Sequence, residues 1–313
     1  MNSADTLDPI GQSRRIAVVG SLNVDHFFAM ERNPLPGETV LADLLMRTAG
    51  GKGANQAIGC ARLGHQVWMA GCVGADADGQ WLRERVRNEG VDVTDVAIVP
   101  EAPTGAAYIF GASGESTIVV VPGANALLAA SAVTASTAIT IADAVLCQLE
   151  IPLDAVQAAV VASRGLVILN PAPAQALSPE LLHRVDVLVP NRLELASLTG
   201  TEPTTDIDRV IDLARSIPVR QGVVVTLGGM GAVAVTHDHS VRVPAWSSHL
   251  VDSTAAGDSF CAALADGLLS GMDLAEATQW AVVAASVTVS RLGAIDSLPR
   301  RDEVACRMLE GAT

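Results

Sequence analysis

The chain has 313 residues, which is enough for one large domain or two smaller ones, and half of its residues are hydrophobic. A formal net charge of −14, with no basic patch to balance it, argues against a nucleic acid as the partner. Aromatic residues make up only 3% of the chain, so its core must be built mainly from Ala, Val, Leu and Ile.

The first third of the chain predicts a short extension followed by mixed elements. Residues 1–13 are polar, so we expect a flexible N-terminal extension and no signal peptide. A buried strand is predicted at 15–20, and helices are predicted at 52–63 and 79–89. Short, partly alternating strands are predicted at 26–30, 39–47, 105–110 and 116–121, with a hairpin turn at 111–115 between the last two.

From residue 127 the pattern becomes an alternation of strands and helices. Continuous apolar runs, typical of parallel strands covered on both faces, occupy 144–149, 167–170, 185–189 and 223–226. Two late helices are predicted at 258–269 and 273–292. This alternation predicts an α/β fold with a doubly wound, mostly parallel sheet flanked by helices.

The cysteines and the apolar stretches bear on the compartment. The five cysteines are widely spaced and form no Cys-x-x-Cys pair, which argues against a disulfide framework or a zinc site. Buried free thiols and a reducing compartment are therefore expected. The longest uncharged stretch, 116–142, contains Pro122 and Gly123 and argues against a membrane span. We expect a cytoplasmic location.

The most informative segment is 251–260, near the C-terminus. Small residues, Gly257 and Asp258 stand at a predicted helix start, where free N–H groups and the helix dipole favour an anion. A carboxylate beside such an anion hole can serve as a general base, so the segment suits phosphoryl transfer to a hydroxyl. An ordinary loop and helix cap use the same residue types, and the segment alone leaves both interpretations open.

Two further segments make the pattern specific. Residues 50–57 (GGKGANQA) open a small-residue helix and match neither a Walker A loop nor the Rossmann fingerprint. Residues 20–25 (GSLNVD) end the first strand. The landmarks that follow in order are QLE at 148–150, NPAPA at 170–174, PNRLE at 190–194 and TLGGMG at 226–231. Together these motifs resemble the PfkB carbohydrate kinase family, from about residue 16 to about residue 298.

The resemblance implies a ribokinase-like fold. It implies a single α/β domain over 14–313, with a small β-sheet lid whose strands come from about 26–48 and 103–122. In the family such lids cover the sugar and can pair two chains into a homodimer. Apolar residues that would suit a contact between lids are Phe27, Phe28, Leu44, Leu45 and Ile118. The same residues could instead simply cover the main domain.

The resemblance also implies roles for residues around the sugar. Asp258 would accept the proton of the attacking hydroxyl, and Ala255, Ala256 and Gly257 would supply the backbone donors of the anion hole. The implied substrate-binding residues are Asn23, Asp25, Gly51, Lys52, Gly53, Asn55, Glu150 and Asp258. On spacing alone, Asn23 and Asp25 could bracket two hydroxyls or form an Asx turn. Lys52 could equally be a solvated loop charge, and Glu150 could cap a strand.

For ATP the matching positions are Asn191, Thr226, Leu227, Gly228, Gly229, Gly231 and Gly257. Asn191 and Glu194 match an Asn-x-x-Glu motif that helps to organise Mg²⁺, often through water, although the spacing also fits a capping box. Relatives often carry Asn or His near the position of Val282, so the preference for a base stays open. The positions that match a K⁺ site are Asp252, Thr254, Thr288, Arg291, Gly293 and Ser297. Asp252 could equally be a turn residue.

The activity implied by the resemblance is ATP-dependent phosphorylation of D-ribose at O5, giving D-ribose 5-phosphate, with Mg²⁺ as cofactor and K⁺ as activator. Deoxyribose, another sugar or a nucleoside are the alternatives. A 2-deoxy sugar would leave hydroxyl-binding groups unpaired, which disfavours it without excluding it. A non-catalytic sugar-binding protein would be expected to lack Asp258 or Gly257, and both are present.

Overall fold

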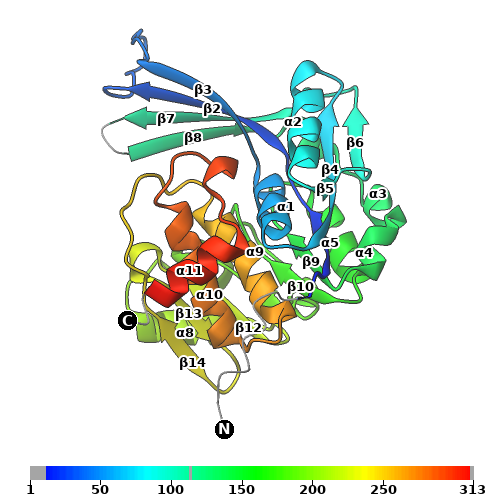
Figure 1. The fold of residues 1–313 in the computed structure, drawn as a ribbon, viewed down its shortest axis with the longest axis vertical. Helices are drawn as coiled ribbons and strands as arrows, with labels where there is room; N and C mark the ends of the chain where they lie inside the picture. Colours follow the sequence, from blue (N-terminus) through cyan, green and yellow to red (C-terminus); the bar gives the residue numbers. More distant parts are fainter. Residues whose placement is uncertain (1–11, 113–114, 311–313) are drawn as a thin grey trace.

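The computed structural model describes residues 12–112 and 115–310, and its centre is a 10-stranded sheet (Figure 1). The strand order is β14-β13-β12-β11-β10-β9-β1-β4-β5, and β6 also pairs with β4. The strands are β1 (Arg15–Val19), β4 (Gln66–Gly74), β5 (Val91–Asp92), β6 (Val96–Val99), β9 (Ala144–Cys147), β10 (Leu166–Leu169), β11 (Val187–Leu188), β12 (Gly222–Thr226), β13 (Ala232–Val235) and β14 (Ser240–Val243). Only the β12–β13 and β13–β14 pairings are antiparallel, so the predicted mostly parallel sheet is confirmed.

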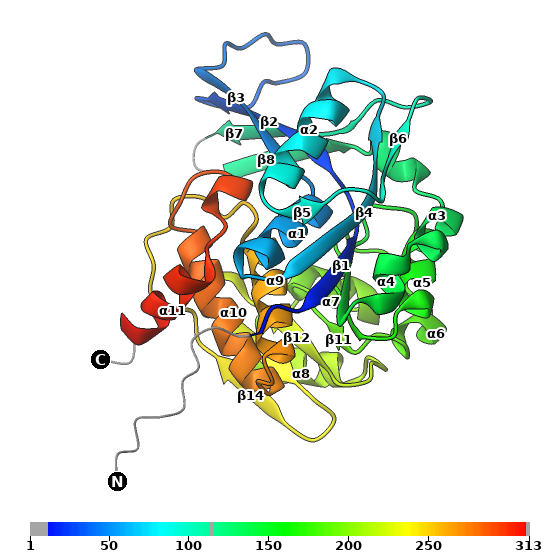
Figure 2. The same ribbon diagram turned by 45° about the vertical axis from the view of Figure 1, so that its right-hand side comes forward.

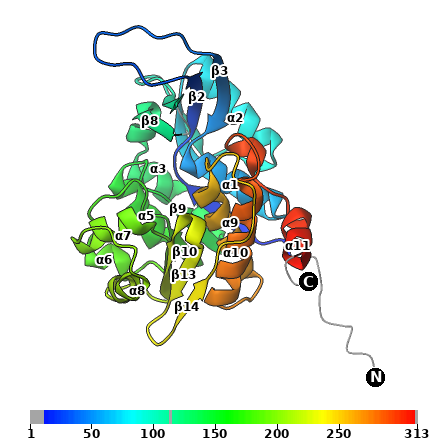
Figure 3. The same cartoon turned by 90° about the vertical axis from the view of Figure 1, so that its left-hand side faces the viewer.

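Helices cover both faces of this sheet, as Figure 3 shows with the sheet between two helical layers. One layer holds α1 (Lys52–Arg62), α2 (Ala77–Asn88), α9 (Ala256–Leu269), α10 (Leu274–Thr288) and α11 (Arg301–Glu310). The other holds α3 (Ala130–Ala135), α4 (Thr137–Ile141), α5 (Leu153–Ala162), α6 (Pro179–Leu182), α7 (Arg192–Thr199) and α8 (Ile207–Arg215). Three short 3₁₀ turns are Gly123–Leu127, Gly228–Met230 and Ile295–Ser297.

The alternation of side chains along β1 explains the two layers. Ile16 and Val18 pack into one hydrophobic core, whereas Ala17 and Val19 pack into the core on the opposite face. A strand buried on both faces must be apolar at every position, which is why these parallel strands read as unbroken apolar runs.

A separate four-stranded sheet forms the lid, which projects beyond one end of the main sheet (Figures 1 and 2). Its order is β3 (Leu44–Gly50), β2 (Asn23–Met30), β7 (Gly105–Ala112) and β8 (Glu115–Val121). β2 pairs antiparallel with β3 and parallel with β7, and β7 pairs antiparallel with β8. The pairing of Ala112 with Glu115 agrees with the predicted hairpin, although residues 113–114 of the turn lie outside the described residues.

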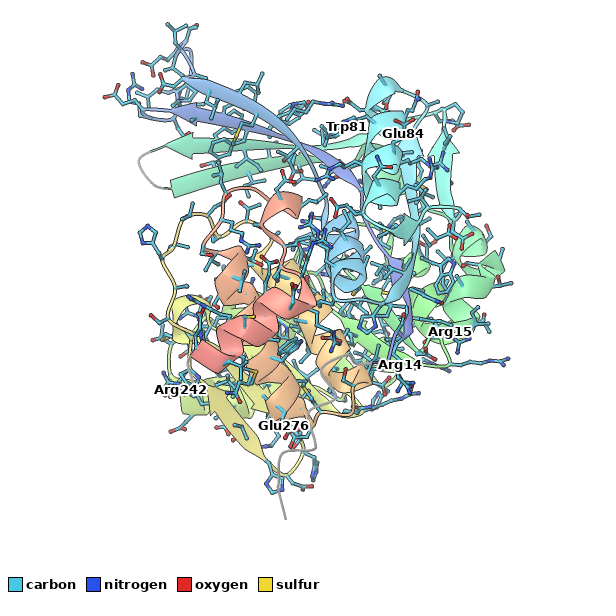
Figure 4. The ribbon with its side chains drawn as sticks, viewed as in Figure 1. Arg14, Arg15, Trp81, Glu84, Arg242 and Glu276 are labelled. Carbon is cyan, nitrogen blue, oxygen red and sulfur yellow. The ribbon has the colours of Figure 1, made fainter. Side chains whose placement is uncertain are left out.

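The lid is anchored at its base and more open at its tip. β2 is buried from Asn23 to Asp25 and half-buried beyond. Arg47 pairs with Asp78, and its guanidinium lies 3.9 Å from the ring centroid of Trp81 on α2, which Figure 4 labels. Because α2 belongs to the main layer, these contacts tie the lid to the core.

Several predicted boundaries are wrong. The strand predicted at 39–47 begins only at Leu44 and continues to Gly50, because residues 39–43 stay outside the sheet and Leu41 is 91% exposed. The helix predicted at 79–89 begins at Ala77, since the Asp76 side chain caps it by accepting from the N–H of Gly79 at 2.7 Å. The helix predicted to reach 292 ends at Thr288.

Two other differences concern apolar segments. The long strand β4 was not predicted, because its glycines and small residues (QVWMAGCVG) obscure the apolar run. Phe27 and Phe28 are half-buried rather than exposed, and Phe28 stacks on Phe110 with ring centroids 5.5 Å apart. Leu44, Leu45 and Ile118 are exposed as expected. Within 12–112 and 115–310, no helix combines the length and apolar character that a bilayer crossing requires.

Candidate active site

The predicted site residues meet at the carboxyl ends of the parallel strands, where α/β sheets usually bind ligands. A pocket of about 660 Å³ opens there beneath the lid. Its polar lining includes Asn23, Asp25, Lys52, Asn55, Glu150, Asn191, Glu194 and Asp258. On the lid side it is lined by Ala107, Ile109, Ile118 and Val120, so one wall is apolar. Gly51 also lines the pocket, whereas Gly53 is buried in α1 behind it.

Asp258 lies in the first turn of α9, which begins at Ala256, two residues earlier than predicted. The residue is 6% exposed and lines the pocket. Its Oδ2 accepts from Nδ2 of Asn55 at 2.9 Å, and its Oδ1 accepts from Nε2 of Gln56 at 3.1 Å. Each oxygen keeps acceptor capacity, so the carboxylate is fixed in orientation and can still take a proton.

The start of α9 has the features of an anion hole. Ala255 adopts a left-handed backbone (φ 59°), which turns the chain sharply into the helix without a side-chain cap. A Cβ added to Gly257 would meet no atom within 4 Å, so the space before the helix is open. Of the three predicted backbone donors, the N–H of Ala256 already has a partner, since it bonds to the carbonyl of Ser253 at 3.3 Å.

Lys52 balances the charge around Asp258. Burial raises the pKa of Asp258, and Lys52 and the two amide donors oppose that rise. For Lys52, burial acts to lower the pKa, but Asp258, Glu150 and Glu194 outweigh it and the pKa is raised. Lys52 is therefore a charged ammonium group in the pocket and not a solvated loop charge.

Two residues that line the pocket each carry a buried acceptor oxygen with no partner within the protein: Oδ1 of Asp25 and Oδ1 of Asn55. Buried polar atoms of a native protein are nearly always hydrogen-bonded, so these atoms call for donors from a ligand. Burial, followed by the charges of Glu150 and Asp258, raises the pKa of Asp25 to about 7. A compound rich in hydroxyl groups would supply the missing donors.

Neighbouring residues hold the same wall of the pocket. Asn23 Oδ1 accepts from Nδ2 of Asn125 at 2.8 Å. Glu150 Oε2 accepts from Oγ of Ser21 at 2.5 Å and from the backbone N–H of Lys52 at 3.2 Å. Glu150 therefore braces the start of α1 and does not cap a strand. Gly51 is required at the turn before α1, because its φ is 88° and a Cβ would collide with the backbone of Leu22 and Asn23.

A second pocket of about 600 Å³ adjoins the first. Thr226, Gly228, Gly229, Ser253 and Gly257 line both pockets. Gly231 lines only the second pocket and Leu227 only the first. The apolar wall of the second pocket includes Trp246, Leu250, Phe260 and Val282, which suits a planar base. The start of α9 thus lies at the junction of a polar and an apolar pocket.

Asn191 and Glu194 form a capping box at the start of α7, as one of the two sequence interpretations predicted. Glu194 Oε2 accepts from the backbone N–H of Asn191, and Oε1 accepts from its Nδ2, both at 2.8 Å. Within the described residues, no group of three His, Cys, Asp or Glu side chains could hold a metal ion. Glu194 can still accept a hydrogen bond from a hydrated Mg²⁺ ion that arrives with nucleotide phosphates.

The segments predicted to bind K⁺ lie side by side. Asp252 Oδ1 accepts from the N–H and the hydroxyl of Thr254 at 2.9 and 2.6 Å, and its Oδ2 accepts from the N–H of Gly293 at 2.9 Å. Thr288 donates to Ser259 Oγ at 2.8 Å. Two predicted residues turn to other partners: Arg291 pairs with Glu303 and Ser297 bonds to the carbonyl of Ala294. Asp252 thus links two loops, which agrees with a turn role.

Some residues of the site escaped prediction. Gln56 and Asn170 stand inside motifs that were singled out, but their types and spacing gave no role. Asn125, which positions Asn23, lies in a 3₁₀ turn between recognised segments. Trp246 and Leu250 belong to an irregular segment without periodicity, so no sequence signal marked them as pocket residues.

Asp258 stands at a helix start between a polar pocket and an apolar pocket, and glycines line both pockets where they meet. This arrangement is that of a phosphotransferase that acts on sugar hydroxyls. The sequence model of the pfkB family carbohydrate kinases matches residues 13–301, and the chain belongs to this family.

Named relatives are similar over almost the full length. The chain is 37% identical over 298 residues to a ribokinase of Haemophilus influenzae, and the alignment covers 93% of this chain and 97% of the relative. It is 34% identical to a deoxyribokinase of Salmonella typhi, over 91% and 95% of the two chains. The structure of Arabidopsis thaliana ribokinase complexed with ribose and ATP superimposes with a TM-score of 0.84 and 32% identity, covering 95% of this chain and 99% of that one.

Proposed function

We propose that this protein transfers the γ-phosphoryl group of ATP to O5 of D-ribose, giving D-ribose 5-phosphate and ADP. The observation that carries the proposal is the pair of unpartnered acceptors, Asp25 Oδ1 and Asn55 Oδ1, in the pocket that also holds Asp258. Hydroxyl groups of a sugar would satisfy both atoms and leave a further hydroxyl for the base. The similarity to ribokinases over almost the whole chain supports ribose as that sugar.

In the proposed reaction, Asp258 accepts the proton of the O5 hydroxyl as O5 attacks the γ-phosphorus. The new O5–P bond forms while the bond to the β,γ-bridging oxygen breaks, and ADP leaves with that electron pair. The open helix start beside Gly257 holds the transferring group, and Lys52 offsets its negative charge. The lid excludes water from the sugar pocket.

The proposed nucleotide site is the second pocket with the loop at Thr226–Gly231, where the glycines allow the phosphates to approach the backbone. Mg²⁺, bound to the phosphates and to water near Glu194, would neutralise phosphate charge. We also propose that K⁺ activates the enzyme at the loops joined by Asp252 and Gly293.

We further propose that residues 14–313 work as one domain and that two lids pair in a homodimer. Leu45 and Ile118 are 61% and 58% exposed on the lid strands, which is costly unless a partner covers them. A cytoplasmic location is proposed because all five cysteines are free, including the exposed Cys306.

The test is ADP release from MgATP with equal concentrations of D-ribose, 2-deoxy-D-ribose, other sugars and nucleosides. Ribose should give a kcat/KM at least about tenfold above that of 2-deoxyribose, since a missing hydroxyl leaves a buried acceptor unpaired. Preferred turnover of deoxyribose or a nucleoside would keep the kinase and overturn the choice of ribose.

A further inference from the structure

A buried glutamine behind the site has no role in the reaction described so far. Gln148 follows the end of β9, is 0% exposed and lines neither pocket. Its Nε2 donates to Oε1 of Gln56 at 2.6 Å, while its own Oε1 has no partner. An apolar side chain of similar size would avoid that unpaired oxygen, so stability alone does not explain an amide here.

The contact with Gln148 fits only one of the two ways in which the amide of Gln56 can face when Gln148 is the donor. Gln56 is 1% exposed, and its Nε2 donates to Oδ1 of Asp258 at 3.1 Å, with a longer contact of 3.5 Å to Oδ1 of Asn170. A flipped Gln56 amide would place an oxygen against the Asp258 carboxylate and two NH₂ groups against each other. With Gln148 donating to its Oε1, Gln56 presents its own donor to the carboxylate, so the two contacts favour the same orientation of the Gln56 amide.

The surrounding backbone is shaped around this pair. A Cβ at Gly20 would overlap the amide of Gln148 and the Cα of Gly53. Gly20 follows β1, Gln148 follows the neighbouring strand β9, and Gln56 lies on α1. The two amides thus link the centre of the sheet to the start of α9.

We propose that Gln148 and Gln56 form a two-amide relay that positions the Asp258 carboxylate and keeps it ionised while the substrates are bound. This inference rests on the proposed function of Asp258 as the general base. Gln56 and Gln148 are positioning residues in this relay, because neither lines the substrate pockets.

The charges facing Asp258 define what the relay must oppose. Lys52 on α1 favours the ionised form, and Glu150 disfavours it. Asp25 on β2, Glu194 on α7 and Cys261 on α9 also interact with Asp258. Burial raises the pKa of Asp258, and the donors Asn55 and Gln56 act against that rise. Losing the Gln56 donor should therefore move the acid limb of the reaction to higher pH.

The experiment measures kcat against pH from about 5.5 to 9 with saturating MgATP and ribose, for the wild type, Gln56→Met, Gln148→Met and the double variant. Methionine keeps the volume of the side chain but cannot donate. Saturating sugar matters because kcat reports the complex, in which Asp25 is engaged by the substrate.

The acid limb of Gln56→Met should move up by about one pH unit, the size expected for one hydrogen bond to a charged group. The shift for Gln148→Met should be smaller, and the double variant should match Gln56→Met, since both changes break one relay. At pH 9 each kcat should return to within about threefold of the wild type, because there the base is ionised again.

Asn125→Ala is the matched control, since it removes a buried amide that positions Asn23 and does not touch Asp258. It should raise the KM for ribose without moving the acid limb. Thermal unfolding checks that each variant folds. A pH-independent loss of kcat, an unmoved acid limb, or additive shifts in the double variant would overturn the relay. A wild type that turns over no acceptor would overturn the proposed function itself. Turnover of another acceptor would leave the relay testable with that acceptor.

Discussion

Replacing Asp25 by asparagine should stabilise the protein while impairing sugar binding. Burial, with Glu150 and Asp258, raises the pKa of Asp25 from 3.8 to about 7. The unfolded chain loses this proton near pH 4, whereas the folded chain keeps it up to about pH 7. The folded state therefore binds more protons in that window, and stability falls as the pH rises through it. A shift of about three units corresponds to roughly 4 kcal/mol above pH 7.

An asparagine side chain cannot ionise, so the Asp25→Asn variant should avoid this penalty. Urea unfolding at pH 8 without sugar should give the variant a free energy of unfolding about 2–4 kcal/mol above the wild type. At pH 5 the advantage should shrink to about 40% of its value at pH 8, because the larger part of the penalty develops only as the pH rises from 5 to about 7. Saturating ribose should stabilise the wild type more than the variant. A variant that is no more stable at pH 8, or one with the same advantage at both pH values, would refute this reasoning.

Other predictions test the remaining parts of the site. Asp258→Asn should lower kcat by about 10²–10⁴-fold, with ATP binding by calorimetry unchanged. Gly257→Val should fill the open space before α9 and lower kcat by at least about 100-fold, while the KM for ribose changes little. A rise in the KM for ribose as large as the fall in kcat would argue against an anion hole. Asp252→Asn should abolish the stimulation of kcat by K⁺, and unaltered stimulation would place the ion elsewhere. Leu45→Glu should convert a dimer to a monomer in light scattering, whereas a wild-type monomer would contradict pairing through the lid.

The sheet was largely predictable from the sequence because its strands are buried on both faces. The apolar runs at β1, β9, β10 and β12 can be recognised as strands without knowing which strands lie beside them. β4 is just as buried, but its glycines and small side chains are accommodated by packing against neighbouring elements that the local pattern does not reveal. The observed start of α2 differs from the predicted one by two residues, because the Asp76 side chain caps the helix.

The site was predictable where short motifs carry it and not where packing creates it. Asn23 and Asp25 come from one motif, and Asn55 and Asp258 each come from another; the structure brings all four into one pocket. The apolar second pocket depends on the position of an irregular segment that contains Trp246. Asn191 and Glu194 form a capping box and also line the pocket, and only the structure shows that both interpretations hold together. Likewise, amide orientations emerge only from tertiary contacts.

The position of the new phosphate ester tests the central claim most directly. Phosphorus–proton correlation NMR of the product formed from D-ribose and MgATP should show one phosphate coupled to the two protons on C5. In Asp258→Asn, which has no carboxylate to accept the O5 proton, the yield of this product at equal reaction times should fall by at least about 100-fold. A phosphate on another carbon, or an undiminished yield from the variant, would contradict the account.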